Sequence, residues 1–198
     1  MVVLEFSTAK NLGLRGSIFA IVGIFLSVTP LSPLGLILML LGVILVLIAL
    51  HGLSEVYGDK SIFRNALGAT IAIILSWILI LVFLYMRTTG ALGTSAIALI
   101  LVMVAVAVSA LLWYRALGAL SASSGVGMFR WAAILYAISA VIFVVGLLLT
   151  LAIIDIIVLI GIFIVLIGGV VNLVSFILLA LGFLYLKPPV TQAPQSGV

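Results

Sequence analysis

The stretch LGLILMLLGVILVLIALHGL, residues 34–53, decides the fold class, because it runs for 20 residues without an Asp, Glu, Lys or Arg. A helix of about 20 apolar residues is long enough to cross a hydrocarbon core of roughly 30 Å. Pro30 and Pro33 precede the apolar run and favour a tight turn, because proline fixes φ and has no N–H to donate. The sequence therefore predicts a membrane-spanning helix that begins just after a turn.

The composition of the whole chain agrees with this interpretation. Of the 198 residues, 67% are hydrophobic and 6% are charged, and the mean hydropathy is +1.65. Soluble domains carry about 25% charged residues. There is no cysteine, so the chain has neither a disulfide framework nor a thiolate metal site. We predict an all-α integral membrane protein whose net charge of +4 favours anionic lipid, and not nucleic acid, as its partner.

Apolar runs of similar length recur along the chain. Polar residues, prolines and glycines divide them into six predicted transmembrane helices, at residues 12–29, 34–53, 65–86, 91–113, from 131 onward, and within 157–186. Residues 131–186 contain one charge, Asp155, and as a single helix they would be about 84 Å long. The chain must therefore turn back, and Asp155 marks the predicted turn. Gly168 and Gly169 could interrupt the last helix.

The distribution of basic residues predicts the orientation in the membrane. We expect residues 1–186 to form one six-helix domain and residues 187–198, KPPVTQAPQSGV, to form a Pro-rich cytoplasmic tail. Arg87 is the only basic residue on one side of the predicted membrane domain. The side that holds both termini carries seven: Lys10, Arg15, Lys60, Arg64, Arg115, Arg130 and Lys187. The positive-inside rule then places both termini in the cytoplasm. The expected inner aromatic belt contains Trp113, Tyr114, Trp131 and Tyr185.

Two polar connections resemble each other. Residues 62–66 read IFRNA and residues 128–132 read MFRWA, and Gly52 and Gly118 lie at the same offset. A parallel internal repeat, in which the second and third helices correspond to the fourth and fifth, would explain the match. The alternative is that each inward helix start simply carries a positive-inside arginine.

The runs STAKNLG, LGVILVLIALHGLSEVYGDKSIFRNALG and GVGMFRWAAILYAI also resemble a family of small archaeal multi-spanning membrane proteins, which is classified only as a domain of unknown function. The resemblance extends over residues 7–186, and SIFRNAL, residues 61–67, is its most specific part. Where the family pattern has an acidic-aromatic pair after Gly-Leu, this chain has SEVY at residues 54–57. The resemblance implies an archaeal source and a plasma-membrane location, and it implies no activity.

His51, Glu55 and Asp59 form one candidate site. On a continuous helix they would lie at i, i+4 and i+8 on one face, where an imidazole and two carboxylates could bind a metal or pass a proton. The alternative, which we favour, is a solvated turn in which Gly58 ends one helix and Ser61 caps the next. We therefore predict no metal and no cofactor.

Asp155 and Asn172 are the candidate intramembrane polar residues. An ionisable group within the hydrocarbon is a candidate for proton or cation transport. The length of the chain on either side of Asp155 favours a turn at the outer interface instead. Asn172 is expected to bridge helices, because a buried amide can hydrogen bond to a neighbouring helix.

A predicted ion pair connects the two polar connections on the cytoplasmic side. Arg115 and Arg130 lie in a connection without an acid, whereas Glu55 and Asp59 lie in the other connection, close to Arg64. We expect Glu55 or Asp59 to approach Arg115 or Arg130, because charge-assisted hydrogen bonds are stronger than neutral ones. Such a contact would clamp the two halves together.

The pattern of functional groups does not predict an enzyme. The sequence contains no H-E-x-x-H, no phosphate-binding G-x-x-x-x-G-K and no second histidine to act with His51. The few polar residues in the helices favour an accessory or packing subunit that binds lipid, other membrane helices or further copies of itself. The alternative is a small ion or solute channel or transporter, which the candidate repeat, Asp155 and Asn172 favour.

Overall fold

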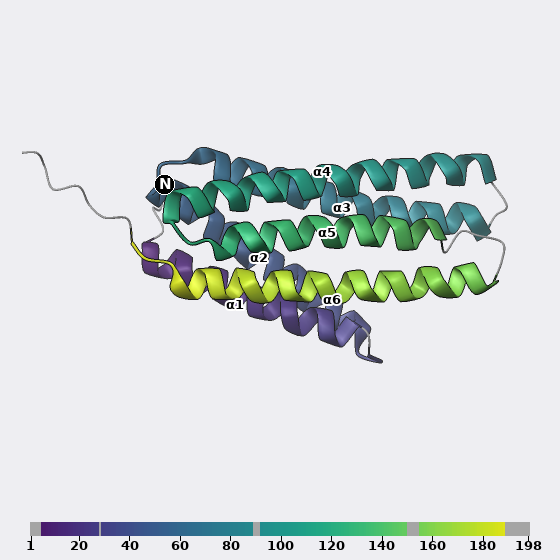
Figure 1. Ribbon diagram of the computed structural model, residues 1–198, viewed down its shortest axis with the longest axis horizontal. Helices are drawn as coiled ribbons and strands as arrows, with labels where there is room; N and C mark the ends of the chain where they lie inside the picture. The colour runs from purple at the N-terminus through teal and green to yellow at the C-terminus, as the bar shows by residue number, and fades with distance from the viewer. Residues whose placement is uncertain (1–4, 28, 89–91, 150–154, 189–198) are drawn as a thin grey trace, which may run out of the picture.

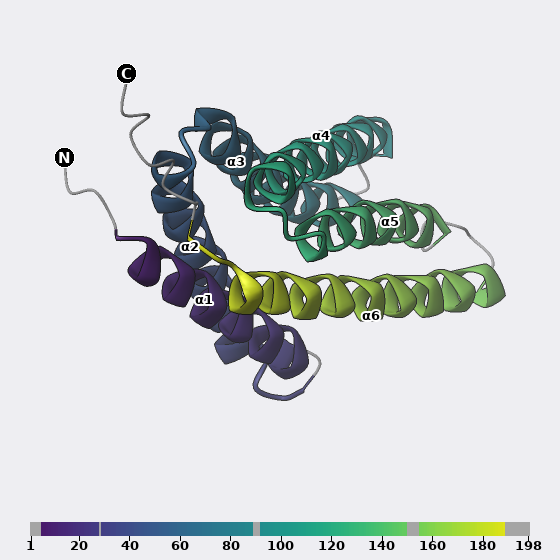
Figure 2. The same cartoon turned by 60° about the vertical axis from the view of Figure 1, so that its left-hand side comes forward.

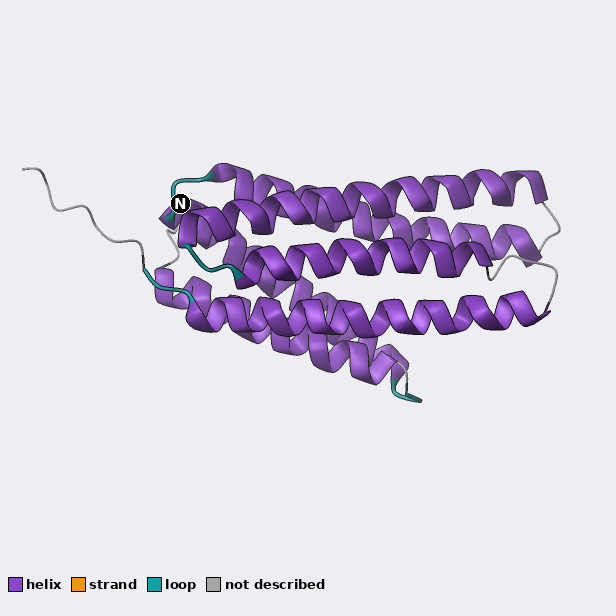
Figure 3. Ribbon diagram, viewed as in Figure 1, coloured by secondary structure: helices purple, strands orange, loops and turns teal. Residues whose placement is uncertain are grey.

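The computed structural model describes residues 5–27, 29–88, 92–149 and 155–188, and within these residues it is entirely helix and short connections (Figures 1 and 3). The helices are α1 (Phe6–Ser27), α2 (Ser32–Val56), α3 (Lys60–Thr88), α4 (Leu92–Ser124), α5 (Met128–Leu149) and α6 (Asp155–Tyr185). All six are long and apolar enough to cross a membrane. The predicted all-α class and the six transmembrane helices are therefore confirmed.

Several helices extend past their predicted bounds, and α4 does so by the most. Helix α4 continues past Trp113 to Ser124, so most of the predicted connection at residues 114–130 is helical. It ends where Gly125 adopts a φ of +71°, a conformation that glycine adopts without a steric penalty. Helix α6 is continuous through Gly168 and Gly169, where an interruption was considered.

Neighbouring helices pair as three antiparallel hairpins, α1–α2, α3–α4 and α5–α6, which make the most extensive interhelical contacts. The α4–α5 and α1–α6 contacts are smaller, and the α2–α3 contact is smaller still. The proposed repeat would match α2–α3 with α4–α5, and these two pairs pack to different extents. The repeat stays a sequence-based prediction.

The large buried side chains gather at the end of the bundle that carries the chain termini. The rings of Phe129 and Phe183 meet edge to face with centroids 5.3 Å apart. Glycines make room for both rings, because a Cβ on Gly13 would collide with Phe183 and one on Gly182 would lie 2.8 Å from Phe129. The other large, fully buried residues nearby are Leu50, Leu53, Ile62, Leu117, Leu120, Leu179 and Leu186.

The α1–α2 hairpin diverges from the other helices with distance from this core (Figure 2). We call residues 18–44, which form its far part, the arm. The buried residues that the structure describes in the arm are all small: Ala20, Gly23, Gly35 and Gly42. These residues face each other across the hairpin, where the two backbones are in direct contact. The arm is therefore a two-helix unit in which every larger side chain that the structure describes has exposed surface.

Hydroxyl groups connect α5 to α6. The Ser139 hydroxyl donates to the carbonyl oxygen of Gly168 over 3.0 Å, and the Ser175 hydroxyl donates to that of Ala132 over 2.8 Å. Both serines are buried. Interhelical hydrogen bonds of this kind contribute about 0.6 kcal/mol each in membrane proteins. They help to hold α5 and α6 together along much of their length.

Candidate functional site

The α2–α3 connection is a tight turn that breaks the predicted face of His51, Glu55 and Asp59. Helix α2 ends at Val56, and Gly58 follows with a φ of +71°. The Asp59 carboxylate accepts a hydrogen bond from the backbone N–H of Ser61 over 2.9 Å, which is the contact of a helix N-cap. The structure thus shows the solvated turn that we favoured, with Gly58 as expected and with Asp59 in place of Ser61 as the cap of α3.

His51 and Glu55 come together on the last turns of α2, without Asp59. The His51 Nε2 atom lies 3.9 Å from a carboxylate oxygen of Glu55, and the imidazole packs against Phe63 with ring centroids 4.6 Å apart. The described residues contain no group of three or more His, Cys, Asp or Glu that could hold a metal ion. His51 Nδ1 is buried without a hydrogen-bond partner.

The predicted ion pair between the two polar connections is not formed as a direct salt bridge among the described residues. The nearest approach of a basic and an acidic side chain among the described residues is that of His51 to Glu55, and Asp59 is engaged in capping α3. Arg64, Arg115 and Arg130 all lie on the exposed surface.

A different set of contacts closes the bundle at this end. The ammonium group of Lys10 donates to the carbonyl oxygen of Leu186 over 2.9 Å, and the Tyr57 hydroxyl donates to that of Lys187 over 2.8 Å. The last carbonyls of a helix have no partner within the helix and favour a cation nearby. Partial burial raises the pKa of the Tyr57 hydroxyl, which keeps it protonated and able to donate. We call these two contacts the latch.

The latch was not foreseen in the sequence. Lys10 is one of the basic residues assigned to this side, but the pattern gives no indication that it reaches the C-terminal end of α6. Tyr57 is an aromatic residue in a polar turn, with no distinctive spacing. The acceptor of neither residue could be predicted, because every residue has a backbone carbonyl and the sequence does not show which one accepts the hydrogen bond.

Asp155 and Asn172 lie far apart along α6. Helix α6 begins at Asp155, so the residue that marks the predicted turn lies at a helix end, and residues 150–154 before it fall outside the described residues. Asn172 is partly buried, and its side-chain oxygen is buried without a hydrogen-bond partner. The predicted bridge from Asn172 to another helix is thus not formed through that oxygen.

Most of the expected aromatic belt is present on the surface. Tyr114, Trp131 and Tyr185 are exposed. Trp113 is not part of the belt, because it is 5% exposed and its ring faces that of Tyr136, with centroids 6.2 Å apart. The sequence places Trp113 correctly along its helix but does not reveal that it points into the bundle.

The polar groups at this end thus support structural contacts: the Asp59 helix cap, the His51–Glu55 contact within α2 and the latch. Two hollows in the described part of the chain lie elsewhere, between α4 and α5, and their lining is almost entirely apolar. The sequence matches no protein-family model, and comparisons with curated proteins and with solved structures find no similar chain.

Proposed function

We propose that this chain is a non-catalytic accessory subunit of a membrane protein complex, and that its arm packs against helices of a partner within the bilayer. We further propose that it resides in the plasma membrane of an archaeon with both termini in the cytoplasm. The observation that carries the proposal is the arm, whose helices contact each other through small residues and expose larger apolar side chains.

Membrane helices associate through close packing and not through expulsion of water, because lipid tails are as apolar as leucine. In the arm, Phe25 is 57% exposed on α1, and Ile37 and Leu40 are 54% and 55% exposed on α2. A partner helix beside these residues would supply the packing that the rest of the chain provides for the core. The position of the arm, attached at one end and diverging at the other, makes it accessible to such a partner (Figure 2).

Site-specific photo-crosslinking in native membranes tests the proposal. A photoreactive amino acid at Phe25 or Ile37 should yield a discrete protein adduct, which mass spectrometry identifies. The same group at Leu81 on α3, which is 66% exposed, serves as a matched control and should label mainly lipid. An adduct with a second copy of this chain would assign the arm to a homo-oligomer. Lipid adducts alone at the arm positions would exclude the proposal.

The second candidate function is a small channel or transporter. The buried, unpartnered oxygen of Asn172 favours it, because such an atom could contact a polar solute within the membrane. Flux of ions or small solutes into liposomes that contain the purified chain would support this function. Loss of that flux in Asn172→Leu, but not in Asn65→Leu near the start of α3, would assign it to Asn172.

A further inference from the structure

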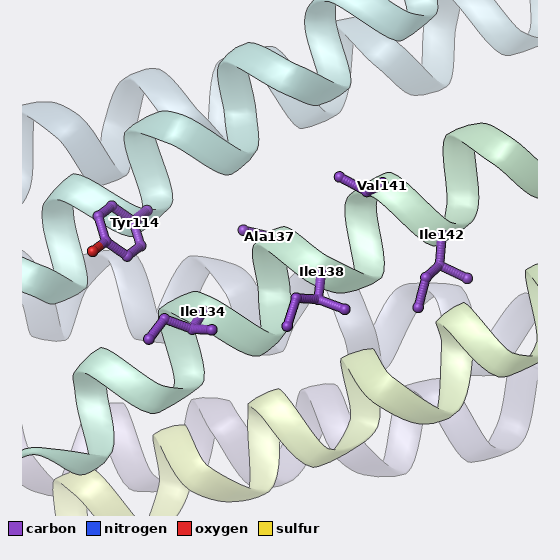
Figure 4. A pocket seen from close by; sticks show the side chains of 6 residues that line it. All are labelled: Tyr114, Ile134, Ala137, Ile138, Val141 and Ile142. Carbon is purple, nitrogen blue, oxygen red and sulfur yellow. The ribbon is translucent and has the colours of Figure 1, made fainter.

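A groove runs between α4 and α5, away from the arm. It consists of two adjoining hollows of about 420 and 450 Å³, which share Tyr114, Ala137 and Val141. These volumes lie within the range of about 300 to 1,000 Å³ that is typical of ligand sites. Figure 4 shows Tyr114 of α4 beside a row of aliphatic side chains on α5. Small residues of the two helices leave the space between them: Ala107, Ala110, Ala137 and Ala140.

The groove has the length and the chemistry of one lipid chain. From Met103 to Tyr114 it follows α4 for about 17 Å, at about 1.5 Å per residue. This distance is close to half of a hydrocarbon core of roughly 30 Å, which is the depth of one leaflet. Its borders are open, since Leu111 is 51% exposed and Val141 is 65% exposed. An acyl or isoprenoid chain could therefore enter from the side.

Two arginines flank the end of the groove that faces the chain termini. Arg115 lies one helical turn beyond the groove residue Leu111, and Arg130 lies one turn before the groove residue Ile134. Residues four apart lie on the same face of a helix, so each arginine extends the row that borders the groove. Both are exposed, and neither guanidinium group takes part in an ion pair or hydrogen bond within the described part of the chain.

No carboxylate in the described part of the chain forms an ion pair with either guanidinium group. The connection between α4 and α5 contains no acid, the first turn of α5 contains none, and Glu55 and Asp59 are engaged at the α2–α3 turn. The N-terminus of α5 adds the positive end of a helix dipole. Trp131, 62% exposed beside Arg130, is of the type that anchors helices at the level of lipid headgroups. The positive charge thus lies where the phosphate of a lipid would be when the lipid's hydrocarbon chain occupies the groove.

We propose that the α4–α5 groove binds one anionic phospholipid, with a hydrocarbon chain along the alanine-lined groove and the phosphate between Arg115 and Arg130. Basic sites between membrane helices can bind the headgroups of anionic lipids. The site uses neither the arm nor a protein partner, so it stands independently of the accessory role.

Native mass spectrometry of the full chain in detergent tests the site by titration with phosphatidylglycerol and with phosphatidylcholine. We expect one phosphatidylglycerol to bind on the order of tenfold more tightly than phosphatidylcholine, because each nearby arginine favours an anionic headgroup. The double variant Arg115→Gln/Arg130→Gln should lose this preference. Arg64→Gln, a matched change of an exposed arginine on α3, should keep it.

A second variant tests the groove itself. Ala137→Phe places a ring in the space that both hollows share and should weaken binding of both lipids while Arg115 and Arg130 stay in place. Circular dichroism would show that each variant keeps its helical content. Equal loss of preference in Arg64→Gln would mean a general basic surface, and undiminished binding to Ala137→Phe would mean that the groove is not the site. Either result would overturn the proposal.

Discussion

Gly42 has no room for a side chain. A Cβ atom at this position would lie 2.6 Å from the backbone nitrogen of Ala20 and 2.6 Å from the carbonyl oxygen of Gly16. Because both are backbone atoms, this collision can be relieved only if the helices move apart, and the rotation of a side chain is not enough. Gly169 on α6 differs in this respect, since a Cβ there would have no atom of the protein within 4 Å.

We predict that Gly42→Ala destabilises the α1–α2 hairpin by about 1 to 3 kcal/mol, which is typical of overpacking. Gly169→Ala is the matched control, and it should be neutral or stabilise α6 by up to about 1 kcal/mol, because alanine favours helix more than glycine. Unfolding of both variants in mixed micelles by increasing amounts of denaturing detergent measures the difference. Equal stabilities would show that the two helices are not in backbone contact at Gly42.

At the scale of the elements, the sequence predicts the helices more reliably than their ends. The number of helices follows from apolar length, which needs no knowledge of packing. The end of α4 was placed too early because Arg115 and the serines after it are polar, although a polar segment can continue a helix beyond the hydrocarbon. The predicted ion pair between the two polar connections did not form for a related reason. An ion pair between helices depends on how each helix is rotated about its axis, and the sequence does not specify that rotation for the helices of Arg115 and Arg130.

The start of α3 provides a test of the local structure. We predict that Asp59→Ala destabilises the first turn by about 0.5 to 2 kcal/mol, because it removes the acceptor for the Ser61 N–H. Asp59→Asn keeps an acceptor and should retain most of the stability. Ser61→Ala should have little effect, since Ser61 contributes its backbone to this contact. Amide hydrogen exchange at the start of α3 measures the effect, and a larger loss in Ser61→Ala would assign the cap to that serine.

The latch makes a prediction about alkaline pH. Burial raises the pKa of Tyr57 above its ordinary value of 10.0, so the protonated hydroxyl is favoured in the folded chain. Its contribution to stability is therefore fully present below pH 10.0 and is lost as the pH rises through the folded-state pKa. The phenolate that then forms cannot donate to the Lys187 carbonyl oxygen. Tyr57→Phe lacks the hydroxyl at every pH.

We therefore expect the wild-type chain to be more stable than Tyr57→Phe near pH 8, and the difference to shrink above pH 10. Thermal unfolding of both proteins, followed by circular dichroism across this range, gives the difference directly. Other titrating groups are common to both proteins and cancel in the comparison. A difference that stays constant up to pH 12 would show that the Tyr57 hydroxyl does not support the latch.

The whole molecule is packed unevenly between its two ends. All six helices contribute buried residues to the core at the end with the termini, where Phe129, Phe183 and the latch lie. A second, smaller cluster around Phe83 and Leu99 holds α3 and α4 together toward the other end. We infer that the core end fixes the arrangement of the hairpins.

The same end carries most of the basic residues. This uneven distribution predicts the orientation of the molecule in the membrane, and the orientation can be tested. The seven basic residues assigned to the side of the termini include Arg64, Arg115 and Arg130, which are exposed at the core end, while Arg87 lies near the end of α3 at the opposite end. Positively charged segments are retained in the cytoplasm during insertion. We therefore expect the core end and both termini to face the cytoplasm.

Because the chain has no cysteine, single cysteines can report the orientation without a background signal. Ser123→Cys places a thiol at an exposed site near the end of α4, and Pro30→Cys places one at the exposed turn between α1 and α2. In intact cells, a membrane-impermeant maleimide should label Pro30→Cys at once and Ser123→Cys only after permeabilisation. The two sites lie at opposite ends of membrane-spanning helices, so each serves as the control for the other. The reverse order of labelling would place the termini outside the cell. In that case, the seven basic residues would have to be held at this end by the core and the latch, against the charge bias that normally sets orientation.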